Sequence, residues 1–325
     1  MQTYEEFHQK SLSEREAFWA EQAKRIHWET PPQQICDYSN PPFARWFVGG
    51  RTNLCYNAVD RHALQRPDDA ALIAVSTETN TEKTYSFSEL QREVERMAAS
   101  LQELGVEQGD RVLIYMPMIA EACFAMLACT RIGAIHSVVF GGFASGSLST
   151  RIDDAQPKVI ISADGGSRGA KPVPYKPLLD EAIHLATHKP AAVLLVDRGL
   201  TPMQLVEGRD VLWSELRTRH MDAQVPCVWL DATAPSYTLY TSGTTGKPKG
   251  VQRDTGGYAV ALATSIPYIY GGAPGETFFS TSDIGWVVGH SYIIYGPLVG
   301  GMATIMYEGL PTQGFDHQPD GGIWW

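Results

Sequence analysis

The sequence lacks the features that mark membrane, secreted and nucleic-acid-binding proteins. No apolar run is long enough to span a bilayer, and residues 1–16 are polar, without the apolar stretch of a signal peptide. The basic residues form no long run, and 36 acidic against 26 basic side chains give a formal net charge of −10. We therefore predict a cytoplasmic protein that has neither nucleic acid nor a membrane as its partner.

Cysteine is scarce as well. The chain has five cysteines, which form no Cys-x-x-Cys pair: Cys36, Cys55, Cys123, Cys129 and Cys227. An odd number at this spacing argues against both a disulfide framework and a zinc site. We expect a reducing compartment and no metal site within this chain.

What the sequence does contain is a regular alternation of strand and helix patterns. At 325 residues and 44% apolar content, the chain can build a substantial core. The patterns predict strands at 71–75, 111–115, 134–139, 158–162 and 193–196, and helices at 53–62, 88–104, 120–132 and 178–186. This alternation predicts an α/β fold with mostly parallel sheets covered by helices.

Short motifs indicate where some helices begin and end. Ser13 followed by Glu16 predicts a capping box near the N-terminus, and Ser88 followed by Gln91 predicts another at the start of the longest helix. Gly133 is suited to ending the helix at 120–132. Between the first two helices, residues 40–47 read Asn-Pro-Pro-Phe-Ala-Arg-Trp-Phe. Because proline prevents a regular helix there, we predict an extended arm whose aromatic side chains pack onto a larger body.

The most informative stretch is 240–250, which reads Tyr-Thr-Ser-Gly-Thr-Thr-Gly-Lys-Pro-Lys-Gly. It follows a β-prone run and precedes a long proline-free segment, so we predict that it connects a strand to a helix. Glycines let the backbone approach a ligand closely, and hydroxyls with ammonium groups bind oxyanions. An ordinary polar turn explains this composition less well. The predicted phosphate-binding residues are Thr241, Ser242, Gly243, Thr244, Thr245, Gly246, Lys247 and Lys249.

This stretch differs from the common nucleotide-binding loop Gly-x-x-x-x-Gly-Lys-Ser/Thr. Thr241 occupies the position of the first glycine, and Pro248 stands where a serine or threonine would follow Lys247. The stretch resembles instead the phosphate loop of the adenylate-forming superfamily, which includes acyl-CoA synthetases, adenylation domains and luciferases.

Three further segments are candidates for ligand contacts, because ligands of parallel sheets bind beyond the carboxyl ends of the strands. The first is the Phe-Gly-Gly-Phe loop at 140–143. The second, 164–171, is rich in glycine and contains two basic residues, although a solvated turn has the same composition. In the third, Trp286 lies between Gly285 and Gly289, where its ring either bounds a small cavity or fills the core. We expect His290 to be a hydrogen-bonded core histidine rather than a base or a metal ligand.

With these motifs the resemblance extends over nearly the whole chain. It is similar to the N-terminal half of short-chain acyl-CoA synthetases, most of all to propionate-CoA ligases. Acetate-CoA ligases share most of the pattern but usually carry threonine at the position of Val288. The motifs are 40–47, 115–118, 138–143, 240–250, 256–258 and 283–292.

The resemblance implies a reaction in two steps. ATP, with Mg²⁺, and a short-chain carboxylate give an acyl-adenylate, and coenzyme A then displaces AMP. It also implies roles for individual residues. Lys249 stabilises the ATP phosphates during catalysis, Trp286, Val287 and Val288 form the acyl pocket wall, and coenzyme A contacts Gly142, Arg168 and Lys171. Lysine at position 171 departs from acetate ligases, which tend to have arginine there.

The resemblance further implies two regions, an arm with helices at 1–65 and an incomplete AMP-binding domain at 66–325. Relatives continue for about as many residues again, and their main catalytic lysine and small C-terminal domain fall beyond this sequence. We therefore expect the chain alone to be inactive. Two alternatives remain: an acetate-CoA ligase, and a non-catalytic fragment that binds coenzyme A, phosphate or a partner chain.

Overall fold

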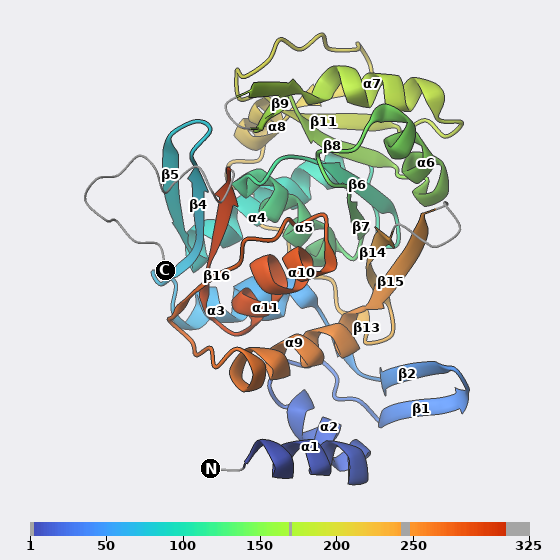
Figure 1. Cartoon of the computed structure of the whole chain (residues 1–325), viewed down its shortest axis with the longest axis vertical. Coiled ribbons are helices and arrows are strands. Elements are labelled where there is room, and N and C mark those ends of the chain that lie inside the picture. Colours follow the sequence, from blue (N-terminus) through green and yellow to red (C-terminus); the bar gives the residue numbers. More distant parts are fainter. Residues whose placement is uncertain (1–2, 169–170, 242–247, 310–325) are drawn as a thin grey trace.

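The computed structural model describes residues 3–168, 171–241 and 248–309. Its centre is a seven-stranded sheet with the order β12-β11-β8-β6-β7-β14-β15 (Figure 1). In chain order these strands are β6 (Arg111–Tyr115), β7 (Ile135–Val138), β8 (Val159–Ala163), β11 (Ala192–Val196), β12 (Asp210–Leu212), β14 (Pro235–Thr241) and β15 (Lys249–Asp254). Every neighbouring pair is parallel except β14 and β15. The predicted α/β class with mostly parallel strands is confirmed.

Helices cover both faces of this sheet. They are α4 (Phe87–Glu103) and α5 (Ala120–Ile132) on one face, and α6 (Ser145–Ala155) and α7 (Tyr175–Leu185) on the other. The alternation of β6 decides which residues face which pair: Val112 and Ile114 pack with α4 and α5, whereas Leu113 and Tyr115 pack with α6 and α7. All of α5 except Glu121 is buried, as expected for a helix that is apolar on every side.

A second sheet has the order β16-β17-β4-β5. Its strands are β4 (Ala70–Ser76), β5 (Thr81–Ser86), β16 (Thr277–Phe279) and β17 (Ala303–Glu308). The helix α4 packs against α5 and against β4 and β5, so it joins the two sheets. The remaining helices of this part are α9 (Thr255–Ile269), α10 (Val287–Gly289), the π-helix η2 (His290–Tyr295) and α11 (Gly296–Val299). One apolar core connects the second sheet and these helices with the α4–α5 face of the large sheet, and a separate core lies between the sheet and α6 and α7.

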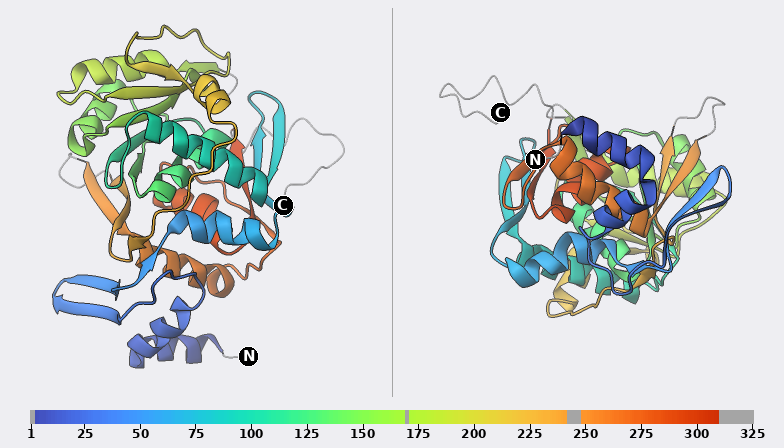
Figure 2. Two further views of the ribbon diagram at one scale, coloured as in Figure 1. Left: turned by 180° about the vertical axis from the view of Figure 1, so that it is seen from behind. Right: turned by 90° about the horizontal axis from the view of Figure 1, so that it is seen from below.

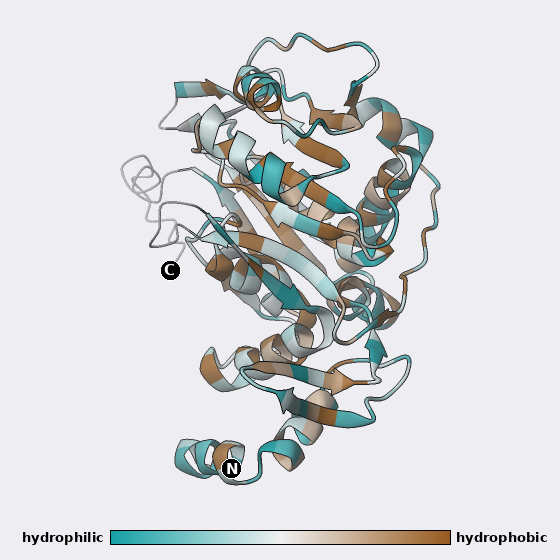
Figure 3. Cartoon of the chain, turned by 90° about the vertical axis from the view of Figure 1, so that its right-hand side faces the viewer, coloured by the Kyte–Doolittle hydropathy of each residue, from teal (hydrophilic) through white to brown (hydrophobic). Residues whose placement is uncertain are grey.

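The chain begins with α1 (Tyr4–Ser13), α2 (Arg15–Ala23), β1 (Gln34–Asn40), β2 (Phe43–Val48), β3 (Arg51–Thr52), the π-helix η1 (Tyr56–Asp60) and α3 (Arg61–Gln65). The helices α1 and α2 and the strands β1 and β2 lie at one end of the molecule beside α9 (Figures 1 and 2), whereas η1 packs against α4 and α11, and α3 packs against α4. Three short strands and one helix complete the fold: β9 (Gly165–Arg168), β10 (Lys171–Pro174), β13 (Leu230–Asp231) and α8 (Trp213–Arg219). Figure 3 shows apolar residues along the large sheet and mostly polar residues in α1. Among the residues described, no helix combines the length and apolar character needed to cross a bilayer.

Both predicted capping boxes are wrong. Ser13 is the last residue of α1, where its hydroxyl donates to the Gln9 carbonyl at 3.0 Å, and is therefore engaged within that helix. The longest helix begins at Phe87, and its N-cap is Ser86 in place of the predicted Ser88, because Ser86 and Glu89 form the box. The Glu89 amide donates to Ser86 Oγ at 3.3 Å, and the Ser86 amide donates to the Glu89 carboxylate at 2.9 Å. Sequence spacing fits both pairs equally well, and the exit direction of β5 selects the earlier one.

The aromatic arm is extended, as predicted, but it forms an antiparallel hairpin of β1 and β2. Its aromatic side chains differ in their exposure to solvent. Phe47 is buried and Trp46 is partly buried, whereas Phe43 near the tip is largely exposed. The hairpin is thus anchored by its base, where Trp46 meets Trp19 of α2 with ring centroids 5.9 Å apart.

The predicted strand-to-helix connection at 240–250 is wrong. Thr241 pairs with Lys249, and Thr238 pairs with Gln252, so the chain passes from β14 into the antiparallel strand β15 before α9 begins. The pairing supplies hydrogen-bond partners to the backbone N–H and C=O groups on the outer side of β14, which would otherwise be unpaired at the edge of the sheet.

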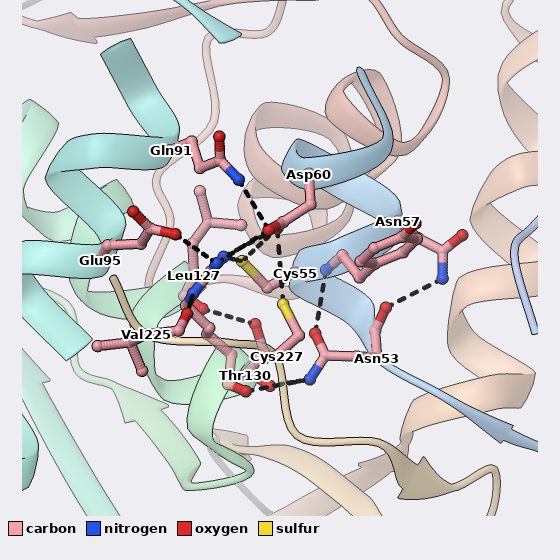
Figure 4. A network of polar contacts seen from close by, with 12 residues as sticks. Asn53, Cys55, Asn57, Asp60, Gln91, Glu95, Leu127, Thr130, Val225 and Cys227 are labelled. Atoms are coloured by element: carbon pink, nitrogen blue, oxygen red, sulfur yellow. Dashed lines mark hydrogen bonds and ion pairs between the residues drawn. The ribbon is translucent and has the colours of Figure 1, made fainter. Parts of the chain in front are cut away.

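A buried ion-pair network joins the N-terminal elements to the large sheet (Figure 4). Arg131 of α5 donates to both carboxylate oxygens of Asp60, at 2.8 and 2.9 Å, and to Glu95 of α4 at 2.8 Å. Its Nε also donates to the Val225 carbonyl. The Arg131 side chain is only 2% exposed. A cation taken out of water in this way is stable only with all these acceptors present.

We predict that Arg131→Met lowers the free energy of unfolding by about 3–5 kcal/mol, because it leaves buried carboxylates without their cation. The matched control is Lys158→Met, which removes the partly exposed pair with Asp110 at 2.8 Å and should cost much less, because water screens this pair. Urea unfolding followed by circular dichroism measures both. Equal losses in the two variants would contradict the structural role assigned to Arg131.

Candidate active site

The candidate site lies at the carboxyl end of two neighbouring strands. Because β7 and β14 are parallel and adjacent, the loop at 140–143 after β7 and the segment after Thr241 leave the same edge of the sheet. The segment 283–289 lies on the first of these loops. A Cβ added to Gly285 would come within 2.9 Å of the Phe140 backbone, so the two chains touch there without a side chain between them.

Six of the predicted phosphate-binding residues, 242–247, lie outside the described residues. The two that flank them are placed: Thr241 ends β14 and Lys249 begins β15, and they face each other in the hairpin register. Both are exposed, and the Thr241 hydroxyl donates to the Lys249 carbonyl at 3.5 Å. The hairpin therefore presents the flanking residues to solvent at the edge where the other candidate loops gather.

Three consecutive apolar residues form an exposed surface at this edge. Trp286, Val287 and Val288 are 46%, 48% and 47% exposed, although they follow the buried Ile284. The Trp286 ring lies 6.0 Å from the ring of Phe140, centroid to centroid. Contiguous apolar exposure of this kind usually marks a binding surface. The prediction that Trp286 bounds a cavity rather than filling the core stays a prediction, and the observed half-exposure fits a wall that is open on one side.

The short helix that carries these residues is held from below by buried rings. His290 stacks on His136 of β7 with centroids 5.5 Å apart, and Tyr237 of β14 lies 4.7 Å from His290. The Tyr258 and Ser291 hydroxyls are 3.0 Å apart. These contacts connect the segment at 286–291 with β7, β14 and α9.

His290 is fully buried, as expected, but it is not a hydrogen-bonded core histidine within the described part of the chain. Neither ring nitrogen has a hydrogen-bond partner among the described residues. Burial lowers the pKa of His290 to about 4, so the ring is neutral near pH 7. The sequence could not predict these surroundings of His290, because the rings of His136 and Tyr237 come next to it only in the folded sheet.

The two segments predicted to contact coenzyme A both pack against the side chain of Tyr175. Gly141, beside Gly142, and Gly166 of β9 both lie against the Tyr175 side chain, in positions where a Cβ would collide with its ring. Lys171 of β10 pairs with Arg168 of β9 across a short hairpin, and Lys171 is exposed. The two glycine-rich loops are therefore neighbours in space.

Two side chains of α6 contact the loop at 140–143 and the end of β14. These two residues were not predicted from the sequence. The Arg151 guanidinium lies 4.4 Å from the centre of the Phe143 ring and 5.8 Å from that of Tyr240. The Tyr240 hydroxyl donates to Asp154 at 2.6 Å, which holds the carboxyl end of β14 against α6. The residues at 145–155 were not predicted to be a helix, so neither side chain could be assigned a partner.

We predict that His290 makes stability fall with acid. Its folded pKa of about 4 is below the ordinary value near 6.5, so the stabilisation is complete above pH 6.5 and is lost as the pH falls toward 4. The full loss is on the order of 3 kcal/mol. In His290→Phe this dependence should become shallower but persist, because burial also lowers the pKa of His136 and of His62, whereas the exposed His184→Phe should keep the wild-type profile. Urea unfolding at pH 7, 6 and 5 measures it, and parallel profiles for His290→Phe and wild type would contradict the burial argument.

Two stretches of the chain match the sequence models of known protein families. Residues 59–318 match the family described as AMP-binding enzyme, and residues 4–58 match the acetyl-coenzyme A synthetase N-terminus. The chain is 62% identical over 323 residues to propionate-CoA ligase of Escherichia coli K12, and equally to that of Salmonella typhimurium. These matches cover 99% of this chain and 51% of each relative.

The chain is also similar to more distant acyl-CoA synthetases. The human mitochondrial acyl-CoA synthetase short-chain family member 3 is 46% identical over 97% of the chain and 45% of the relative. The structure of acetoacetyl-CoA synthetase from Streptomyces lividans superposes with a TM-score of 0.87 at 29% identity, over 95% of this chain and 47% of that one. The chain spans about half the length of the curated relatives it matches. The chain therefore belongs to the family of AMP-binding enzymes, in the branch of the acyl-CoA synthetases.

Proposed function

We propose that this chain forms the first half of an enzyme that joins a short-chain carboxylate, with propionate favoured, to coenzyme A at the expense of ATP. The observation that carries the proposal is the 62% identity to two propionate-CoA ligases across 99% of the chain. The exposed apolar wall at 286–288 supports it, because a short acyl chain needs an apolar surface of small extent.

The proposed chemistry has two steps. A carboxylate oxygen bonds to the α-phosphorus of MgATP, and the bond from that phosphorus to the bridging oxygen breaks, releasing pyrophosphate. The sulfur of coenzyme A then bonds to the acyl carbon, and AMP leaves. The first step brings two anions together, so it needs positive charge and oriented donors around the phosphates. The loop at 241–247 and Lys249 would supply these groups to the β and γ phosphates.

The acyl wall would orient the carboxylate toward that loop. In this proposal Trp286, Val287 and Val288 contact the alkyl chain, and the contact of the Trp286 ring with the Phe140 ring sets the depth of the pocket. His290, neutral and buried, would hold this segment against β7 and β14. The opposite wall would come from the part of the relatives that lies beyond this chain's length.

Coenzyme A would approach from the side of the two glycine-rich loops. We assign Gly142 to the thiol path, because a side chain there would collide with the Phe140 ring. Arg168 and Lys171, paired across the hairpin, would contact the phosphates of its nucleotide end. We also propose that residues 1–65 form the N-terminal arm, that residues 66–325 belong to the AMP-binding domain, and that the protein is cytoplasmic.

The direct experiment joins residues 1–309 of this chain to the C-terminal half of the E. coli relative. The chimera should catalyse pyrophosphate exchange into ATP when propionate is added, and acetate should support a lower rate. One methylene contributes only about 1–3 kcal/mol in such a pocket, so the preference should be graded. A faster exchange with acetate would replace propionate by acetate as the substrate. A folded chimera without exchange for either acid would contradict the proposed activity.

In the same chimera we predict that Val288→Phe lowers kcat/KM for propionate about 10-fold or more, and for acetate by less, because the larger ring shortens the pocket. The matched control is Val206→Phe, which changes a similarly exposed valine outside the candidate site and should leave both values unchanged. Steady-state coupled assays with the two acids measure the effect. Equal losses for both acids would remove Val288 from the pocket wall.

A further inference from the structure

Two cysteines that are far apart in the sequence meet at the ion-pair network of Arg131. Cys55 precedes η1, and Cys227 lies in the segment between α8 and β13. Their sulfurs and one oxygen of Asp60 all lie within 4.8 Å of one another (Figure 4). The distance from Asp60 Oδ2 is 3.5 Å to the Cys227 sulfur and 3.9 Å to the Cys55 sulfur.

The surroundings argue against a metal ion at this place. Both oxygens of Asp60 already accept from the Arg131 guanidinium, and Oδ1 accepts from Gln91 as well, at 2.9 Å. Arg131 Nη1 also lies 3.6 Å from the Cys55 sulfur. A divalent cation here would have to displace a buried guanidinium from two carboxylates, which costs the full stabilisation of the network.

The segment that carries Cys227 is held on both sides. The Arg131 side chain donates to the Val225 carbonyl, and the Val228 amide donates to the Arg131 carbonyl at 2.8 Å. Asn53 Nδ2 donates to the Val228 carbonyl, also at 2.8 Å. The backbone therefore keeps the Cys227 side chain directed at Cys55, so the meeting of the two sulfurs is built into the fold.

We propose that Cys55 and Cys227 form an oxidisable dithiol, a modification site that a peroxide converts into an intramolecular disulfide. A disulfide needs a sulfur separation of about 2 Å. The two sulfurs are already within 4.8 Å, so the bond needs them to approach by less than about 3 Å. This site is separate from the proposed catalytic residues, and its existence does not depend on the proposed function.

The reaction balances with a peroxide as the oxidant. Cys227 is partly exposed whereas Cys55 is fully buried, so the Cys227 sulfur meets the peroxide first. A sulfur–oxygen bond forms, the oxygen–oxygen bond breaks, and the thiol proton leaves in one molecule of water. The Cys55 sulfur then bonds to the Cys227 sulfur, the sulfur–oxygen bond breaks, and a second molecule of water carries away the oxygen and the Cys55 proton.

The environment makes this oxidation slow. The hydrogen bond with Cys55, together with burial, raises the pKa of the Cys227 thiol, so it is protonated near pH 7. We therefore expect oxidation over minutes to hours under excess peroxide rather than a fast response to trace amounts. Once formed, the disulfide would covalently link the residue before η1 to the segment before β13. In the reduced protein these two segments are joined only by non-covalent contacts.

The experiment treats the folded chain with excess hydrogen peroxide, alkylates it in denaturant and maps the peptides by mass spectrometry. We expect loss of two of the five free thiols, a linked Cys55–Cys227 peptide, and recovery of all five with dithiothreitol. Cys55→Ser and Cys227→Ser should each abolish the linkage. The matched control Cys123→Ser, which changes a fully buried cysteine of α5, should retain it.

The outcomes separate the proposal from chance oxidation. Oxidation after unfolding in urea should give mixed linkages, because the fold no longer holds the two sulfurs together. A folded chain that keeps all five thiols under peroxide would overturn the proposal, and so would linkage between any other pair. Circular dichroism of the two serine variants establishes that they are folded, so that loss of the linkage reports on the thiols themselves.

Discussion

The rest of the structure depends on the burial of one guanidinium. Arg131 binds Asp60 from the N-terminal elements, Glu95 from α4 and the Val225 carbonyl from the segment before β13. These three groups are distant in sequence and become neighbours only around this cation. Because a buried charge without acceptors is very costly, the network tolerates little displacement of any member. It fixes α5 beneath the large sheet, and α5 in turn supports the strands from which the candidate site emerges.

The candidate site is a consequence of strand order. Since β7 and β14 are parallel neighbours, the loop containing Gly142 and the loop after Thr241 leave one edge together, and the segment carrying Trp286 lies on the first of them. Three apolar side chains at 286–288 remain half exposed at this edge. A chain about half as long as its relatives thus presents one wall of a site, and the proposed reaction would need a second wall to exclude water and close on the nucleotide.

Features that depend on local pattern were predictable from the sequence, and those that depend on tertiary context were not. The bounds of β6 and α5 were predicted correctly, because a short apolar strand and a helix ended by Gly133 carry their signals within a few residues. The Ser88–Gln91 box was wrong because Ser86 is an equally suitable cap two residues earlier, and the Ser13–Glu16 box was wrong because Ser13 ends α1. The β14–β15 hairpin was missed because its pairing is set by the sheet edge. The contact of Arg151 with Tyr240, and the His290 ring without a hydrogen-bond partner among the described residues, had no sequence signal, since their neighbours come from distant strands.

We propose that this chain supplies one wall of a nucleotide site. Isothermal titration of MgATP into the chain, and into its chimera with the C-terminal half of the E. coli relative, tests that claim most directly. The account predicts weak or undetectable binding by the chain alone and clear binding by the chimera, because contacts of the phosphate loop cannot replace those to adenine and ribose. Sub-millimolar binding of MgATP by the chain alone would contradict it.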